Sequence, residues 1–172
     1  TTYVSGPQNT VNALCTGLGI PTTHLVTIDM AQFAEIIDSL GGVEVNVPEP
    51  VRDAYTGLNL TSAGRHRLKG IDALALVRSR HPEILRNGTW EAMSEADGAQ
   101  HRSQSTTMVM QAVLSAVGQE SSNPVTLHRL AHTVAGNITL DSGSGLGDLI
   151  VLARSAAKAQ KAGTTTIIDL PT

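Results

Sequence analysis

Apolar residues recur at helical spacing in three segments of the chain. Residues 6–19 have a proline in the first turn and glycines at the end, as many helices do. Residues 97–117 carry a long apolar stripe. In residues 30–42 the apolar side chains share one helical face ahead of a glycine pair, and they are Phe33, Ile36, Ile37 and Leu40. These patterns predict three helices.

Other segments alternate apolar and polar positions or are rich in β-branched residues, which is typical of strands. Such segments are residues 23–30, 43–47 and 164–170. Two shorter helices are expected at 124–137 and 144–163. A proline lies at the start of the first and basic residues lie toward the end of the second, as is common at helix termini.

Three further segments are harder to interpret. Residues 52–70 resemble a loop with one short strand at 57–61, and residues 71–77 fit either a core helix or a buried strand. Residues 81–97 are polar and interrupted by proline and glycine, which predicts a mobile surface loop. Taken together, we expect an α/β fold in which residues 1–172 form a single three-layer-like domain, with a central mixed sheet flanked by helices.

The composition narrows the possible functions. The 172 residues carry a formal charge of -3, and only 2% are aromatic. A platform of aromatic rings for stacking nucleic-acid bases is therefore not expected. The single cysteine, Cys15, excludes an internal disulfide, and no segment has the apolar length that spans a bilayer.

Positive charge is concentrated in the middle of the chain. Seven of the nine arginines lie between positions 52 and 102, and they are Arg52, Arg65, Arg67, Arg78, Arg80, Arg86 and Arg102. A weakly acidic protein with one arginine-rich segment suits a small anionic ligand better than a long polyanion.

Arg78 and Arg80 are the strongest candidates for binding an anion. If a helix ends near Val77, these two side chains project from the same side of an extended segment, about 6.6 Å apart, which fits a diphosphate. Arg102 at the start of the next helix could add a third guanidinium. The alternative is that the pair forms a solvated helix end whose charge complements the helix dipole.

Other titratable residues give weaker signals. Asp53 and Asp97 could orient an arginine or a metal, or could equally cap a loop or helix. His128 and His132 are spaced as a helical pair, but the sequence offers no third ligand beside them, so a structural role is the preferred interpretation.

A family resemblance rests on three strings: residues 24–53, "HLVTIDMAQFAEIIDSLGGVEVNVPEPVRD"; residues 57–81, "GLNLTSAGRHRLKGIDALALVRSRH"; and residues 101–104, "HRSQ". Together they resemble the LytR-CpsA-Psr family of cell-wall enzymes. The resemblance implies a phosphotransferase that moves a glycopolymer from a polyprenyl diphosphate carrier onto peptidoglycan. It also implies that Arg78, Arg80 and Arg102 are catalytic, and that Arg52, Asp97 and Gln104 bind substrate.

The sequence departs from the family pattern in two places. The family's domain has earlier strands with metal-binding aspartates, so we expect this chain to be the larger, carboxy-terminal part of such a domain. The family's helix motif, Asp-x-x-Arg-x-x-Arg-Gln, is met here by Asp97 and Gln104, with Arg102 one position early. The resemblance implies Mg²⁺ with ligands in the earlier part, and a membrane anchor outside this chain with the domain on the cell-wall face. Whether this chain alone is active stays open.

Two alternatives differ in class from a transferase. A non-catalytic module that binds polyprenyl phosphate or glycan would use the same arginines without transfer. A transcription regulator is disfavoured, because the sequence shows no helix-turn-helix with a basic recognition helix and the charge is negative. Nucleic acid is therefore not an expected partner.

Overall fold

The computed structural model describes residues 7–19 and 26–120, together with isolated positions at 125, 133, 139–140, 145, 147–148, 151, 154–155, 158–159 and 162. The helices expected at 124–137 and 144–163 and the strand expected at 164–170 lie outside the continuously described residues. The described elements, in chain order, are α1 Pro7–Asn12, the π-helix η2 Ala13–Gly17, β1 Val26–Thr27, α2 Met30–Ser39, β2 Val43–Val47, β3 Val51–Asp53, β4 Leu58–Leu60, β5 Gly64–Leu68, α3 Gly70–Arg78, β6 Glu83–Arg86, β7 Thr89–Ala92, α4 Glu95–Glu120 and β8 Thr139–Leu140.

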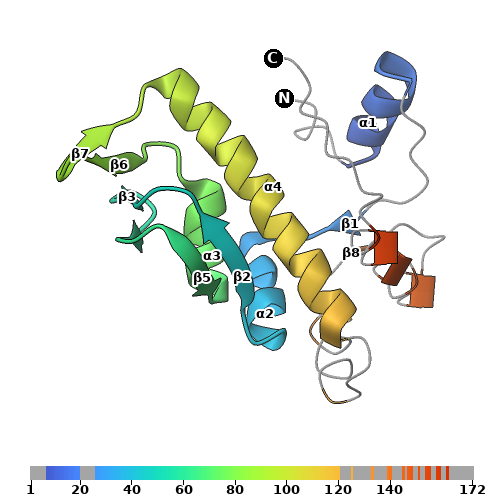
Figure 1. The fold of residues 1–172 in the computed structure, drawn as a ribbon. Helices are drawn as coiled ribbons and strands as arrows, with labels where there is room; N and C mark the ends of the chain where they lie inside the picture. Colours follow the sequence, from blue (N-terminus) through green and yellow to red (C-terminus); the bar gives the residue numbers. More distant parts are fainter. Residues whose placement is uncertain are drawn as a thin grey trace.

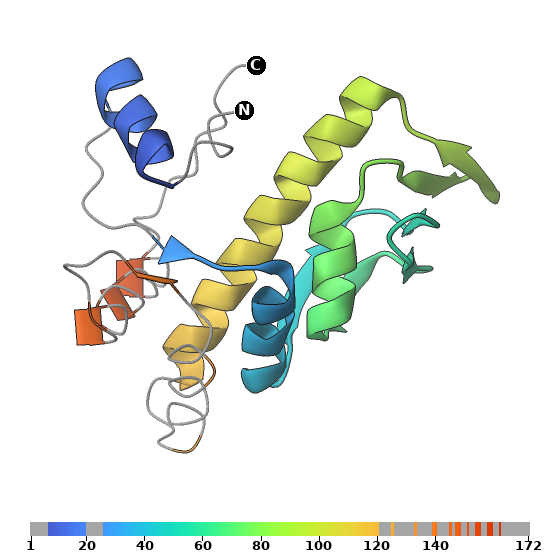
Figure 2. The ribbon, with the colours of Figure 1, turned by 180° about the vertical axis from the view of Figure 1, so that it is seen from behind.

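The expected α/β class is confirmed, and the described strands pair only in antiparallel fashion. They form three sheets, β1–β8, β2–β5 and β4–β3–β6–β7, so no parallel pair of the expected mixed sheet is found among them. Figure 1 shows α4 running along β2, and Figure 2 shows α2 and α3 side by side. Helix α3 packs against both α2 and α4.

Helix α2 begins and ends at signals that its sequence provides. The Asp29 carboxylate accepts a hydrogen bond from the Gln32 N–H at 2.8 Å, and the Gln32 side chain accepts one from the Asp29 N–H at 2.9 Å, which is a capping box. Gly41 and Gly42, with φ of 75° and 91°, then turn the chain into β2. The alternation of β2 buries its valines in the aliphatic core, while the intervening side chains stay exposed.

Two segments expected to be mainly loop contain more strand than predicted. In residues 52–70 the short strand expected at 57–61 is confirmed as β4, whereas the end of β3 and all of β5 were not predicted, and β5 forms a five-residue ladder with β2. The pairing with β2 overrides a sequence pattern that lacks apolar alternation. Residues 81–97 hold the β6–β7 hairpin, because Asn87 and Gly88 have φ of 50° and 79° and form the two-residue turn that antiparallel strands favour.

Residues 71–77, which the sequence left undecided, belong to helix α3. The N–H of Gly70, its first residue, donates to the Asp38 carboxylate of α2 at 2.8 Å. At Gly70 the two helices approach so closely that an added Cβ would stand 2.1 Å from the Ala34 carbonyl oxygen. Within the described residues, every helix is too short or too polar to cross a lipid bilayer.

Gly70→Ala tests this close contact. The new methyl group would overlap backbone, so α3 must move away from α2, and we expect the free energy of unfolding to fall by about 2 kcal/mol or more. Urea denaturation monitored by circular dichroism measures the loss. Gly17→Ala is the matched control, since no atom lies within 4 Å of its added Cβ and a change within about 0.5 kcal/mol is expected. Equal effects of the two substitutions would contradict the packing.

Candidate active site

A buried carboxylate organises the region around the two central arginines. Asp53, at the end of β3, is only 1% exposed. Its Oδ2 accepts hydrogen bonds from the Ser79 hydroxyl at 2.7 Å and from the backbone N–H groups of Arg80 and His81 at 3.1 and 3.0 Å. Its Oδ1 accepts one from the Tyr55 N–H at 2.9 Å. One side chain thus joins the end of β3 to the turn after α3.

These bonds decide the charge of Asp53. Burial by itself raises the pKa of the carboxyl group, whereas the Ser79 hydroxyl and the three backbone N–H groups stabilise the anion. The net effect is a pKa below the ordinary value, so Asp53 is ionised at neutral pH. The negative charge it needs to hold the turn is therefore present under physiological conditions.

The turn presents Arg78 and Arg80 on the same side. Helix α3 ends at Arg78, and Ser79 adopts an extended conformation with φ of -60° and ψ of 117°. Ser79 is fully buried at 0% exposure, whereas both flanking arginines are exposed. The expected helix end is confirmed.

Arg78, Arg80 and Arg102 all line one hollow of about 490 Å³, which we call the arginine hollow. Its lining is completed by Met30, Asp53, Tyr55, Thr56, Val77 and His81. Three arginines and one carboxylate are among the lining residues, so the hollow favours an anion. Arg102 reaches the arginine hollow from α4. This helix lies close to the turn, as shown by Gly98, where an added Cβ would stand 3.1 Å from the Arg80 carbonyl oxygen.

An aromatic pair stands at the edge of the arginine hollow. The rings of Tyr55 and His81 have centroids 5.0 Å apart and are tilted by 55°. Tyr55 is 85% exposed and Met30, on the α2 side, is 56% exposed. The arginine hollow therefore combines a cationic lining with exposed apolar groups.

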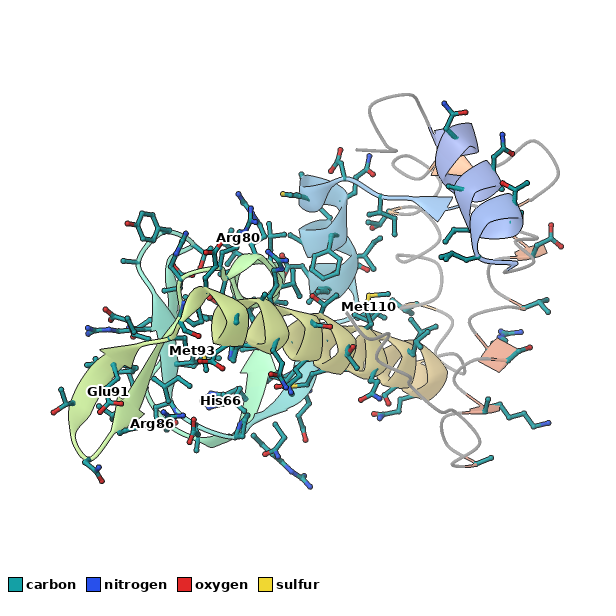
Figure 3. The ribbon with its side chains drawn as sticks, turned by 90° about the horizontal axis from the view of Figure 1, so that it is seen from above. His66, Arg80, Arg86, Glu91, Met93 and Met110 are labelled. Atoms are coloured by element: carbon teal, nitrogen blue, oxygen red, sulfur yellow. The ribbon has the colours of Figure 1, made fainter. Side chains whose placement is uncertain are left out.

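Asp97 and Gln104, two of the expected substrate-binding residues, lie in a different hollow. This second hollow, of about 380 Å³, is lined by residues of β3, β6, β7 and α4, including Glu49, Arg86 and His101. Arg102 and Gln104 are two positions apart on α4 and hence point in nearly opposite directions, so the helix separates them. Figure 3 shows Arg80 well apart from Arg86 and Glu91, which line the second hollow.

His101 is the most deeply buried titratable side chain of the second hollow. Burial lowers its pKa, an effect that the nearby Glu49 opposes, and the net direction is downward. Its Nδ1 is buried without a hydrogen-bond partner among the described residues. The ring is therefore neutral at pH 7.

Arg52, the third expected substrate-binding residue, also lies away from the arginine hollow. It forms an ion pair with Glu83 on the neighbouring strand β6, and its guanidinium lies 4.4 Å from the ring centroid of Trp90. Side chains alternate along β3, so Arg52 points to the opposite face from Asp53. The structure thus brings three of the six expected site residues together.

The described residues contain no cluster of potential metal ligands. No group of three or more His, Cys, Asp or Glu side chains with metal-binding geometry occurs among them. Among the described residues, Asp53 is the only carboxylate that lines the arginine hollow, and both of its oxygens already accept hydrogen bonds. His128 and His132 lie outside the described residues.

Sequence reasoning missed the contributions of Ser79 and Tyr55. Ser79 stands between two arginines and looked like a spacer, yet it is the buried residue that anchors the turn. Tyr55 follows Asp53 by two positions, the spacing at which an aspartate commonly accepts a backbone hydrogen bond in a turn. This spacing is the sequence signal from which the hydrogen bond between Tyr55 and Asp53 could have been predicted.

Asp53→Asn tests the role of the buried carboxylate. The amide nitrogen cannot accept the bonds that Oδ2 accepts, so we expect the free energy of unfolding to fall by about 3 kcal/mol at pH 7. Because the folded-state pKa of Asp53 lies below the unfolded value, its contribution is present above the unfolded pKa and is lost as pH falls through the folded one.

Urea denaturation at pH 7 and at pH 3 or below measures both effects, with the difference between the two proteins shrinking in acid. Asp72→Asn, on the exposed first turn of α3, is the control and should cost less than about 1 kcal/mol. An Asp53→Asn protein as stable as the unsubstituted one at pH 7 would contradict the assignment.

Comparisons with known proteins agree with this architecture. The LytR_cpsA_psr family matches residues 2–169. A curated relative, the cell wall biosynthesis protein LcpA of Corynebacterium glutamicum, is 30% identical over 139 residues, which are 81% of this chain and 25% of the relative. The polyisoprenyl-teichoic acid–peptidoglycan teichoic acid transferase TagU of Bacillus subtilis is 33% identical over 75 residues, covering 44% of this chain and 24% of TagU.

Solved structures share the fold. A LytR-Csp2A-Psr enzyme from Actinomyces oris is 84% identical, with a TM-score of 0.90 over 99% of this chain and 62% of that one. TagT bound to LI-WTA is 21% identical, with a TM-score of 0.61 over 90% of this chain and 52% of TagT, and shows the fold alone. The chain thus spans about a quarter of the two curated relatives, and because the family match extends over nearly all of its residues, it belongs to the LytR_cpsA_psr family.

Proposed function

We propose that the protein is a phosphotransferase that moves a glycopolymer from a polyprenyl diphosphate carrier onto peptidoglycan. The observation that carries the proposal is the arginine hollow, in which Arg78, Arg80 and Arg102 converge beside exposed apolar side chains. Family membership and the names of the relatives, a cell wall biosynthesis protein and a teichoic acid transferase, support the same activity.

The arginines fit the electrostatic demands of this reaction. A diphosphate carries negative charge before transfer, and the departing phosphate gains charge as the P–O bond breaks. Guanidinium groups stay protonated and bind phosphate oxygens in pairs, so they can hold the ground state and stabilise the leaving group. Asp53 is a positioning residue in this scheme, because it fixes the backbone from which Arg80 projects.

The apolar part of the hollow fits the carrier. Met30, Val77 and Tyr55 line the hollow together with the arginines, and the side chains of Met30 and Tyr55 are largely exposed. An amphiphile with an anionic head and an aliphatic tail can contact both kinds of group at once. A free polyanion would leave these apolar side chains in water.

Cofactor, partners and location are part of the proposal. Magnesium is proposed from the family resemblance, with ligands outside the described residues. The relatives' names support an extracytoplasmic location at the cell envelope, with the polyprenyl diphosphate-linked glycopolymer and peptidoglycan as substrates. Attachment to the membrane through an anchor outside this chain is likewise proposed.

The alternative function is a binding module that captures polyprenyl phosphate or glycan without transferring it. The same arginines and apolar groups would serve that role. The formation of glycopolymer-linked peptidoglycan separates the two functions, because only the transferase releases polyprenyl phosphate.

Single substitutions of Arg78, Arg80 and Arg102 to alanine test the proposal. Each removes one guanidinium from the arginine hollow, and we expect product formation to fall about 100-fold or more for Arg78 and Arg80, and less for Arg102. Release of polyprenyl phosphate from a labelled lipid-linked donor in the presence of peptidoglycan and Mg²⁺ measures the rate, with the substitutions made in a protein that also contains the earlier part of the domain.

Arg65→Ala is the matched control. Arg65 lies on β5 with its side chain 83% exposed, paired only with Glu44 at 3.4 Å, and its loss should leave the rate unchanged within about twofold. Undiminished product from both Arg78→Ala and Arg80→Ala would refute the role of the arginine hollow.

A further inference from the structure

The proposed transfer has one proton-transfer step that the arginines cannot perform. The leaving group is a phosphate oxygen, which departs as an anion that guanidinium groups stabilise. The attacking group is a sugar hydroxyl, which is a weak nucleophile and must lose its proton as it bonds to phosphorus. The reaction therefore requires a general base close to the arginines that takes the proton of the attacking hydroxyl group.

The side chains that line the arginine hollow in the described part of the chain offer few bases. Arginine stays protonated at any relevant pH, and a tyrosine phenol ordinarily ionises only near pH 10. The Asp53 carboxylate is 1% exposed and already accepts four hydrogen bonds. His81 is left, and a neutral imidazole ring has one nitrogen that can accept a proton.

His81 is also held in place at two points. Its backbone N–H donates to Asp53 Oδ2 at 3.0 Å, which fixes the residue directly after Arg80. Its ring packs against that of Tyr55, whose own N–H donates to the other oxygen of the same carboxylate. Both members of the ring pair are thus anchored by Asp53, while the His81 side chain remains exposed toward the hollow.

We propose that His81 is the general base of the transfer reaction. A neutral ring nitrogen takes the proton of the acceptor hydroxyl while the hydroxyl oxygen bonds to the glycan-bearing phosphorus. The bond from this phosphorus to the bridging oxygen breaks, and its electron pair leaves with polyprenyl phosphate. The imidazolium then passes its proton to that phosphate or to water, so atoms and charge balance. This inference rests on the proposed function and names a residue for its proton step.

The groups that face His81 define its surroundings. They are Asp53 and Tyr55 from the end of β3 and the turn after it, Arg78 and Arg80 from the end of α3, and Arg102 from α4. Arginine charge remains constant across the pH range of an assay, and Asp53 stays ionised because its pKa is lowered.

His81→Gln is the kinetic test. We expect kcat to fall about 100-fold to 10,000-fold with KM changed little, because the base acts in the transition state. His66→Gln is the matched control, since His66 on β5 bonds the Ser62 carbonyl oxygen and lies across α4 from Arg80 in Figure 3.

The outcomes separate this inference from the proposed function. If Arg80→Ala abolishes transfer while His81→Gln keeps kcat within about threefold, the base assignment is wrong and the function stands. If the unsubstituted protein that also contains the earlier part of the domain releases no polyprenyl phosphate in the presence of Mg²⁺, the proposed function fails.

Nuclear magnetic resonance tests the placement of His81 without turnover. Addition of inorganic pyrophosphate should move the ring resonances of His81 and leave those of His66 in place. Unmoved His81 resonances at a pyrophosphate concentration that shifts the arginine side-chain signals would overturn the assignment.

Discussion

The arrangement of the candidate active site depends on one ionised carboxylate buried at the end of β3. Asp53 gathers four donors from two separate segments, and its charge makes each of these hydrogen bonds stronger than a neutral one. Backbone N–H groups make up three of the four donors, so the carboxylate constrains the path of the chain as well as side chains. Arg78 and Arg80 share a side because the residue between them is bound inward to this carboxylate. The catalytic groups of the proposed reaction therefore depend on a residue that does not itself contact substrate.

Helix α4 contributes residues to both hollows and separates them. Its first turns contact the Arg80 backbone through Gly98, and one face contributes Arg102 to the arginine hollow. Another face contributes Asp97, His101 and Gln104 to the second hollow, which mixes carboxylates and amides with a single guanidinium. One helix thus separates an anion-binding region from a region of different polarity. The β6–β7 hairpin extends outward beyond the start of α4 and completes the second hollow (Figures 1 and 2).

Local sequence patterns predicted the elements whose ends or alternation are determined by residues close in the sequence. The capping box of α2, the alternation of β2 and the end of α3 at Arg78 follow from short-range chemistry. Strand β5 was missed, because its basic residues show no apolar alternation and its pairing with β2 is a tertiary contact. The β6–β7 hairpin was missed although Asn87-Gly88 is a strong turn signal, since it was interpreted as a loop breaker. The convergence of Arg78, Arg80 and Arg102 was predictable from helix ends, whereas the separation of Asp97 and Gln104 depends on which face of α4 packs inward.

A crystal structure of the protein with a short-chain prenyl diphosphate bound would test the central claim most directly. The account predicts that the diphosphate lies in the arginine hollow, with oxygens about 2.7–3.1 Å from guanidinium nitrogens of Arg78 and Arg80, and with the prenyl chain against Met30 and Tyr55. The Asp53 hydrogen bonds should remain as they are in the unliganded protein. A diphosphate bound in the second hollow, or one that contacts neither Arg78 nor Arg80, would contradict the account.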